Sequence, residues 1–243
     1  MLMRVLRTAG WWLALLVVTP PMALIAILSF PFAPRTRHRI ISVWTHMMVW
    51  VIRNVLGIRD RVIGRENIPA RASVALAKHQ SAWETILLQV ILPPQVFVLK
   101  RELLRLPFFG WGLAQMPMIA IDRNAGKDAL SQVVEQGRDR LDMGLWVVVF
   151  PEGTRVPVGQ SKRFKIGGAH LATATGAPVV PIAHNAGECW PRNAIMTQPG
   201  EIVVSIGPAI ETAGRTALEV NEQAQAWIEA EMRRLFPHHY ATS

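Results

Sequence analysis

Cysteine is nearly absent from the sequence, which has only Cys189. A single thiol excludes a disulfide within the chain and a cysteine-based zinc cluster. Cys189 is therefore expected to be a small buried apolar residue. The histidines and acidic residues show no spacing typical of zinc ligands, and His238 and His239 near the end are expected to be surface residues. The sequence thus predicts no metal site.

Three sequence patterns that identify common enzyme classes are also missing. Without a G-x-S-x-G elbow, the chain is not expected to be a serine hydrolase of the usual α/β kind. Gly110-Trp111-Gly112 lacks the third glycine of the dinucleotide fingerprint, and no phosphate-binding P-loop is present. No cofactor is therefore expected.

Acidic residues are too few to balance the basic ones, which leaves a formal net charge of +9. The imbalance is concentrated in residues 1–61, which hold eight arginines and one acidic residue, Asp60, and are also the most apolar part of the chain. Basic and apolar character together indicate an anionic membrane surface. A nucleic-acid-binding chain would more often carry its basic residues on a polar face with interleaved aromatics.

Only one long apolar run lacks charge, from Trp11 to Phe32, and it is long enough to cross a bilayer. Pro20-Pro21 divides it near the middle. Arginines lie on both sides, whereas a single span would carry them on the cytoplasmic side only. These flanks favour a bent or re-entrant helix, although a spanning helix remains an alternative. With the apolar segment 40–56, the run predicts two helices that dip into one leaflet. No small-x-small cleavage site follows, which argues against a signal peptide.

From about residue 60, short β-type runs alternate with helical patterns. This alternation predicts an α/β fold with a mainly parallel or mixed sheet flanked by helices. The expected strands are 73–77, 95–99, 118–121, 145–150, 178–183 and 201–206, and the expected helices are 82–92, 127–142, 165–175 and 216–236. We therefore divide the chain into membrane-associating helices, 1–58, and a second domain, 59–243.

The stretch 78–85 reads K-H-Q-S-A-W-E-T and places His79 and Glu84 five residues apart. On one continuous helix the two side chains would lie about 140° apart and would not meet. If His79 lies in the loop before the helix, Glu84 in the first turn can reach back to it. Ser81-x-x-Glu84 is the capping-box pattern and supports that boundary. Alternatively, Glu84 only caps the helix and His79 is an ordinary loop histidine.

Three basic residues, Lys100, Arg123 and Arg155, come just after apolar strand-like runs. Ligands of open α/β sheets bind at the carboxyl ends of the strands. If the strands are parallel, these three cations converge near His79, which follows a fourth strand. Converging cations are typical of a site for a phosphate or a carboxylate.

Four blocks stand in the order and rough spacing of a known family: His79-x4-Glu84, Ile121-Asp122-Arg123, Phe150-Pro151-Glu152-Gly153-Thr154-Arg155 and Val179-Val180-Pro181-Ile182. They resemble the glycerolipid acyltransferases, and within that family the bacterial lysophosphatidic acid acyltransferases. The resemblance covers about residues 40–210, and the F-P-E-G-T-R block is its most specific part. One departure is Glu84, where the family usually has aspartate.

The resemblance implies a role for each matched residue. His79 would be the general base on the lysolipid hydroxyl, and Glu84 would orient its imidazole. Lys100, Arg123 and Arg155 would bind the acceptor phosphate. Glu152, Gly153 and Thr154 would shape the substrate loop, and Pro181 would help form the acyl-donor site. An apolar tunnel for the acyl chain is also expected, with Phe108, Phe109 and Trp111 as candidates to line it, unless these are ordinary core or membrane-facing aromatics.

The implied function is acyl transfer from acyl-CoA or acyl carrier protein to the sn-2 hydroxyl of 1-acyl-sn-glycerol 3-phosphate, giving phosphatidic acid. The expected location is the bacterial inner (cytoplasmic) membrane, with the active site facing the cytoplasm. The expected partners are membrane lipids and the two substrates, without nucleic acid or metal. Two alternatives stay open: another lysolipid acceptor, such as lyso-ornithine lipid, and a non-catalytic lipid-binding membrane module.

Overall fold

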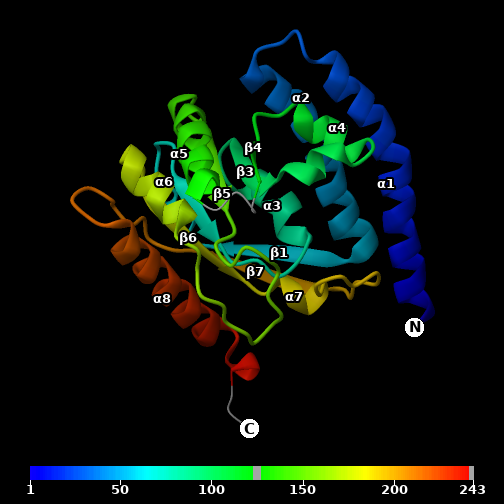
Figure 1. Cartoon of the computed structure of the whole chain (residues 1–243). Helices are drawn as coiled ribbons and strands as arrows, with labels where there is room; N and C mark the ends of the chain where they lie inside the picture. The colour runs from blue at the N-terminus through cyan, green and yellow to red at the C-terminus, as the bar shows by residue number, and fades with distance from the viewer. Residues whose placement is uncertain (123–126, 241–243) are drawn as a thin grey trace.

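The computed structural model describes residues 1–122 and 127–240, and a seven-stranded mixed sheet lies at its centre (Figure 1). The strands are β1 (Ile58–Ile63), β2 (Val74–Ala77), β3 (Gln95–Lys100), β4 (Ile119–Ile121), β5 (Trp146–Val149), β6 (Val179–His184) and β7 (Gly200–Ile206). Their order is β1-β7-β6-β2-β5-β3-β4. All neighbouring strands are parallel except β6 and β7, which are antiparallel.

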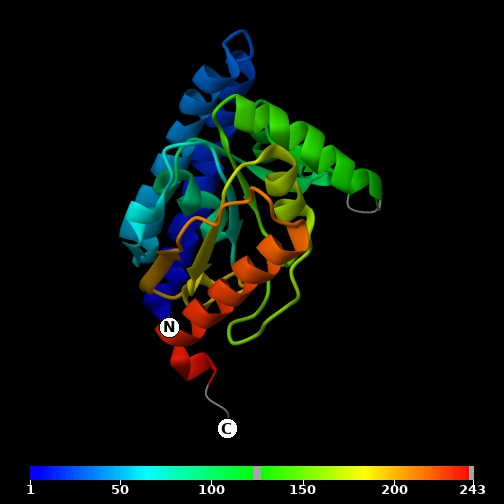
Figure 2. The ribbon, with the colours of Figure 1, turned by 90° about the vertical axis from the view of Figure 1, so that its left-hand side faces the viewer.

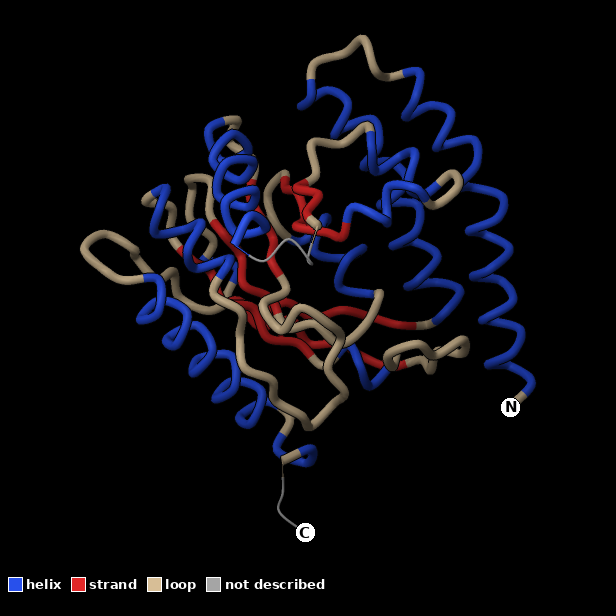
Figure 3. Tube along the Cα trace, viewed as in Figure 1, coloured by secondary structure: helices blue, strands red, loops and turns tan. Residues whose placement is uncertain are grey.

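The central strands are buried because their sequences are apolar at every position. β2 reads Val-Ala-Leu-Ala and β5 reads Trp-Val-Val-Val. Continuous apolar runs of this kind are typical of parallel strands covered on both faces. Helices provide that cover, as the strands between two helical layers in Figure 3 show.

One helical layer consists of α5 (Lys127–Asp142), α6 (Gly167–Thr175) and α8 (Ala217–Leu235). The other side carries α1 (Leu2–Leu28), α2 (Pro34–Val51), α3 (Trp83–Ile91) and α4 (Phe109–Ala114) (Figure 2). Shorter elements are α7 (Ala186–Cys189), a π-helical turn at Ile52–Leu56 and 3-10 turns at Arg65–Asn67, Arg101–Arg105 and Pro237–His239. The predicted α/β fold is therefore confirmed, and each predicted strand and helix occurs within a few residues of its expected bounds.

The N-terminal helices differ from the prediction in one respect: α1 continues without interruption through Pro20 and Pro21. Each proline removes a backbone donor, which normally breaks or kinks a helix. Here α1 packs against α2, α4 and the π-helical turn, so tertiary contacts hold the helix across the prolines. At 27 residues it is about 40 Å long.

Among the described residues, α1 is the one helix long and apolar enough to cross a membrane, and most of it is not buried. Thr8, Trp11, Ala23 and Ala26 are its buried residues. Its exposed large apolar side chains include Leu2, Leu6, Trp12, Leu13, Leu16, Val17, Leu24 and Leu28. An exposed apolar surface of this extent indicates association with a membrane.

Sequence patterns did not predict β1, which forms the edge of the sheet beside β7. Its sequence, Ile-Arg-Asp-Arg-Val-Ile, carries three charged residues, and an edge strand tolerates them because one side faces solvent. Arg61 pairs with Glu201 of β7, and Asp60 pairs with Arg53. Part of the N-terminal basic excess is thus neutralised by acidic partners within the fold.

Candidate active site

The parallel strands bring chemically distinct side chains to one edge of the sheet. β2, β3 and β5 run in the same direction, so their carboxyl ends lie together. His79 follows β2, Lys100 ends β3, and Arg155 lies in the loop after β5. All three line one cavity of about 880 Å³. Arg123, the third predicted cation, lies outside the described residues.

His79 and Glu84 form a dyad at the wall of this cavity. His79 Nδ1 lies 2.8 Å from Glu84 Oε1. The Glu84 side chain is fully buried, whereas the His79 side chain is 16% exposed. A carboxylate accepts only, so Nδ1 carries the proton and donates it in this hydrogen bond. The tautomer leaves His79 Nε2 unprotonated, as a general base requires.

Two further donors hold the Glu84 carboxylate in place. Its Oε1 also accepts the backbone N–H groups of Gln80 at 2.8 Å and Ser81 at 2.7 Å. Burial by itself raises the pKa of Glu84, but the hydrogen bond from His79, the nearby imidazoles and the backbone donor outweigh it, so the pKa is lowered. The capping-box prediction is half right: Glu84 reaches the Ser81 N–H, but Ser81 Oγ accepts from Trp83 N–H.

The loop after β5 holds His79 on three sides. The Phe150 ring stacks on the imidazole, with centroids 4.1 Å apart and planes 16° from parallel. Val156 N–H donates to the His79 carbonyl at 2.7 Å. On the other side, Glu152 Oε1 accepts the His79 N–H at 3.4 Å. The F-P-E-G-T-R block therefore fixes both the ring and the main chain of the histidine.

Glu152 is itself fixed by a buried ion pair with Lys78. Lys78 Nζ lies 3.3 Å from Glu152 Oε1, and both side chains are at most 4% exposed. Lys78 Nζ also donates to the Gln160 carbonyl at 3.2 Å. Burial raises the pKa of Glu152, and the positive charge of Lys78 opposes this rise. Glu152 thus lies behind the histidine and does not line the cavity.

The remaining residues of the loop are placed by a tight turn. Gly153 has a φ of +71°, which a side chain would strain, and its N–H donates to the Phe150 carbonyl at 3.0 Å. The turn directs the chain onward through Thr154 to Arg155, which is half-buried at the cavity wall. Lys100 is exposed at the same cavity.

Most of the cavity wall is apolar and comes from the helices α1, α2, α3 and α4, which cover one face of the sheet. Its residues include Trp11, Trp44, Ile86, Phe109 and Leu113. Of the three aromatic residues expected to line a tunnel, Phe108 and Phe109 do so, whereas Trp111 packs beside Phe108 instead. An apolar cavity with two cations and a histidine at its wall fits an amphiphile with an anionic head group.

Pro181 lies elsewhere, in the interior strand β6 between β7 and β2. It is buried and is not among the residues that line the cavity. The ladder between β6 and β7 begins at Ile182, so the missing N–H of Pro181 interrupts no pair with β7. Its expected contribution to an acyl-donor site stays a prediction.

Comparisons with known proteins agree with this geometry. Residues 59–185 match the family model "Acyltransferase". The chain belongs to this acyltransferase family. It is 48% identical over 218 residues to a 1-acyl-sn-glycerol-3-phosphate acyltransferase of Pseudomonas aeruginosa, which covers 86% of this chain and 85% of that one.

A more distant relative and a solved structure extend the comparison. A Cocos nucifera protein with the same name is 28% identical over 217 residues, covering 87% of this chain and 68% of that one. The crystal structure of a 1-acyl-sn-glycerophosphate (LPA) acyltransferase from Thermotoga maritima has a TM-score of 0.80 and 22% identity, covering 96% of this chain and 95% of that one. The structural likeness confirms the predicted fold.

A second histidine, His184 at the end of β6, lies buried beneath the dyad of the acyltransferase. Its Nε2 lies 2.7 Å from the Lys78 carbonyl, and its Nδ1 accepts the Ala186 N–H at 3.2 Å. This pattern requires a neutral imidazole with its proton on Nε2. Desolvation lowers the pKa of His184, although the charge of Glu84 and the bond to the Lys78 carbonyl oppose the shift.

Lowering the pH is expected to destabilise the acyltransferase through His184. Because its folded-state pKa lies below the ordinary value of 6.5, the unfolded chain takes up this proton first. The stabilisation is complete above a pH of about 6.5 and is lost as the pH falls through the folded pKa. His184→Gln can still donate to the Lys78 carbonyl but does not titrate. In urea titrations, the parent is expected to lose stability relative to this variant between about pH 7 and pH 5, by at most about 2 kcal/mol because the unfolded imidazole titrates near pH 6.5.

Glu152 has the opposite effect on the pH dependence of stability. Its raised pKa makes the fold more stable as the pH falls. That contribution is common to the parent and His184→Gln, so it cancels in the difference between their unfolding free energies. Parallel pH dependences of the two proteins would show that His184 is not held neutral.

Sequence patterns did not predict the supporting residues Lys78, Phe150 and His184. Lys78 did carry a signal, because it ends an apolar run and directly precedes the histidine. A charged residue that close to a buried strand needs a partner. Nothing in the sequence identified Glu152 as that partner, since the pairing depends on β2 and β5 being neighbours.

Proposed function

We propose that this acyltransferase moves a fatty acyl group from a thioester to the sn-2 hydroxyl of 1-acyl-sn-glycerol 3-phosphate, giving phosphatidic acid. The observation that carries the proposal is the His79–Glu84 dyad, with its carboxylate buried and its imidazole at the wall of an apolar cavity that Arg155 and Lys100 also line. The name of the Pseudomonas relative supports the same acceptor.

In the proposed reaction, His79 Nε2 accepts the proton of the acceptor hydroxyl. The oxygen attacks the thioester carbonyl carbon, a tetrahedral intermediate forms, and the C–S bond breaks. The proton then passes from the imidazolium to the departing thiolate. The Glu84 carboxylate keeps the proton of the neutral ring on Nδ1 and stabilises the imidazolium. No residue is acylated, because the thioester is already activated.

The cations and the apolar wall would bind the two ends of the acceptor. Arg155, with Lys100 and Arg123, binds the phosphate, since a guanidinium and a phosphate match in charge and geometry. The cavity accommodates an acyl chain beside the dyad. The reaction uses no cofactor, and the co-substrate is acyl-CoA or acyl carrier protein. Glu152, Gly153 and Thr154 shape the loop that holds His79 and Arg155.

The N-terminal helices, residues 1–58, would hold this site against the bilayer. α1 contacts the rest of the fold near both of its ends: Arg4 Nε donates to the Thr197 carbonyl, and Ala26 lies close to Gly112 of α4. A helix attached at both ends cannot cross a bilayer without submerging the fold. We therefore place α1 along the membrane surface, with its exposed apolar side in the lipid.

This placement spares the acceptor from leaving the membrane completely, which would cost about 0.8 kcal/mol per CH₂ group. Because bacterial acyl thioesters are cytoplasmic, we propose that the protein works at the bacterial inner membrane with its active site on the cytoplasmic side.

An acceptor panel tests the proposed function. Purified protein is supplied with several lysolipids, including lysophosphatidic acid, lyso-ornithine lipid and lysophosphatidylcholine, and with acyl-CoA or acyl carrier protein as donor. Mass spectrometry identifies the acylated products. Phosphatidic acid is expected as the main product. Preferred acylation of lyso-ornithine lipid would replace the acceptor in the proposal, and no acylation of any acceptor would favour a non-catalytic lipid-binding module.

Arg155→Ala is expected to raise KM for lysophosphatidic acid about tenfold or more and to change kcat less, because a charge-assisted contact to the phosphate is lost. Steady-state kinetics with varied acceptor measures this. Arg163→Ala, an exposed arginine in the same loop, is the matched control and should leave KM unchanged. An unaltered KM in Arg155→Ala would remove this residue from the phosphate site.

A further inference from the structure

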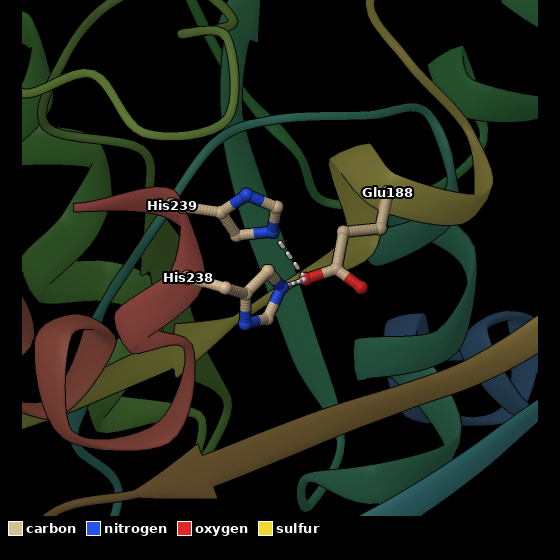
Figure 4. Close-up of side chains that lie close together, drawn as sticks. All are labelled: Glu188, His238 and His239. Carbon is tan, nitrogen blue, oxygen red and sulfur yellow. Dashed lines mark hydrogen bonds and ion pairs between the residues drawn. The ribbon is translucent and has the colours of Figure 1, made fainter. Parts of the chain in front are cut away.

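Three side chains that can ligate a metal meet away from the catalytic cavity. They are Glu188 of α7 and His238 and His239 of the 3-10 turn after α8 (Figure 4). One ligand atom from each lies within 4.8 Å of the others. None of the three lines the cavity that contains His79. About 50 residues separate Glu188 from the histidines in the sequence, which is why the spacing of the residues did not reveal the group.

A hydrogen bond explains only part of this arrangement. His239 Nε2 lies 2.7 Å from Glu188 Oε1, which is hydrogen-bond distance. His238 Nε2 lies 3.6 Å from the same oxygen, too far for a hydrogen bond. Both imidazoles nevertheless direct Nε2 toward this one carboxylate oxygen, as Figure 4 shows. A shared cation would satisfy both ring nitrogens and the carboxylate together.

We propose that Glu188, His238 and His239 form a binding site for a divalent transition-metal ion, with Zn²⁺ as the principal candidate. Zinc binds imidazole nitrogen and carboxylate oxygen at about 2.0–2.2 Å, usually with four ligands. Three protein ligands leave one position for water. Mg²⁺ and Ca²⁺ prefer oxygen ligands and do not fit a pair of imidazoles. The proposal departs from the sequence-based expectation that the chain holds no metal.

Metal binding here would tether the C-terminal turn to α7. Glu188 is 29% and His239 23% exposed, and the hydrogen bond between them already orders these two ligands, whereas His238 is 62% exposed and reachable from solvent. α7 leads directly into Trp190, whose ring meets Trp11 of α1 edge-on at 5.1 Å. The role of the metal is therefore structural: it stabilises the segment that carries Trp190 and does not take part in acyl transfer.

Isothermal titration calorimetry on tag-free, EDTA-treated protein in detergent tests the site with ZnCl₂. One Zn²⁺ per chain is expected to bind. Glu188→Gln and His239→Ala should each weaken binding about tenfold or more, since removal of even a second-shell partner costs about 10–100-fold. His170→Ala on α6 removes a histidine outside the group and should bind Zn²⁺ like the parent. Unchanged affinity in both ligand variants would overturn the proposal, as would an absence of binding by the parent.

Two further measurements distinguish the site from a folding defect. At a free Zn²⁺ concentration of about 100 times Kd, the Tm of the parent should rise by about 5 °C or more, and that of Glu188→Gln much less. Electron paramagnetic resonance of bound Cu²⁺ should show two imidazole nitrogens in the parent and one in His238→Ala. An identical nitrogen count in both proteins would exclude His238 as a ligand. These readouts do not depend on the proposed acyl transfer.

Discussion

Replacing His79 with asparagine is expected to lower kcat about 10²–10⁴-fold, the usual contribution of a general base. Asparagine keeps an amide donor near the Glu84 carboxylate, so the buried acceptor retains a partner and the fold is preserved. It offers no basic nitrogen to the acceptor hydroxyl. Single-turnover kinetics with lysophosphatidic acid and a labelled acyl thioester would measure the loss, and binding of the lysolipid should persist because Lys100, Arg155 and the apolar wall are unchanged.

Glu84→Gln complements this variant. Glutamine can place its carbonyl oxygen where Glu84 Oε1 accepts from His79 and from the Gln80 and Ser81 N–H groups, so the imidazole tautomer is kept, but it provides no negative charge for the imidazolium. The loss of kcat should be of the same order as for His79→Asn, and the double variant should be little worse than either single one, because the two side chains act as a unit. His170→Ala serves as the surface control. Acyl transfer by His79→Asn at the parental rate would show that the base lies elsewhere.

The sequence was sufficient to predict every strand of the sheet except β1, because periodicity and strand ends depend on nearby residues. The runs before His79 and Phe150 are apolar at every position, which identifies buried parallel strands without any knowledge of their neighbours. Once the strands are parallel, the convergence of His79, Lys100 and Arg155 follows from topology alone.

What could not be predicted depends on contacts between distant segments. The Lys78–Glu152 pair, the stack of Phe150 on His79 and the hydrogen bond of His184 to the Lys78 carbonyl join residues 71 to 106 positions apart. Contacts between distant segments also explain why α1 is uninterrupted. Its packing against α2 and α4 overrides the local effect of two prolines.

Lys78→Met is expected to produce the largest loss of stability among these substitutions, about 3–5 kcal/mol at neutral pH. Methionine fills a similar volume, so the effect isolates the charge. The variant leaves the Glu152 carboxylate buried without its cation, and the pKa of Glu152, already raised by burial, should rise further. Urea unfolding at constant detergent concentration measures the loss. The destabilisation should shrink as the pH falls, because protonation removes the uncompensated charge.

The double variant Lys78→Met/Glu152→Gln distinguishes a charge effect from a packing effect. Removal of both charges should recover most of the lost stability, since a buried pair is costly mainly when one partner is left alone. Activity should recover less, because the His79 N–H then faces a neutral amide in place of a carboxylate fixed by Lys78. Arg71→Met, which breaks the exposed pair with Glu211, is the matched control and should cost less than about 1 kcal/mol. If Lys78→Met were as mild as Arg71→Met, the buried pair would not be what holds the loop against the histidine.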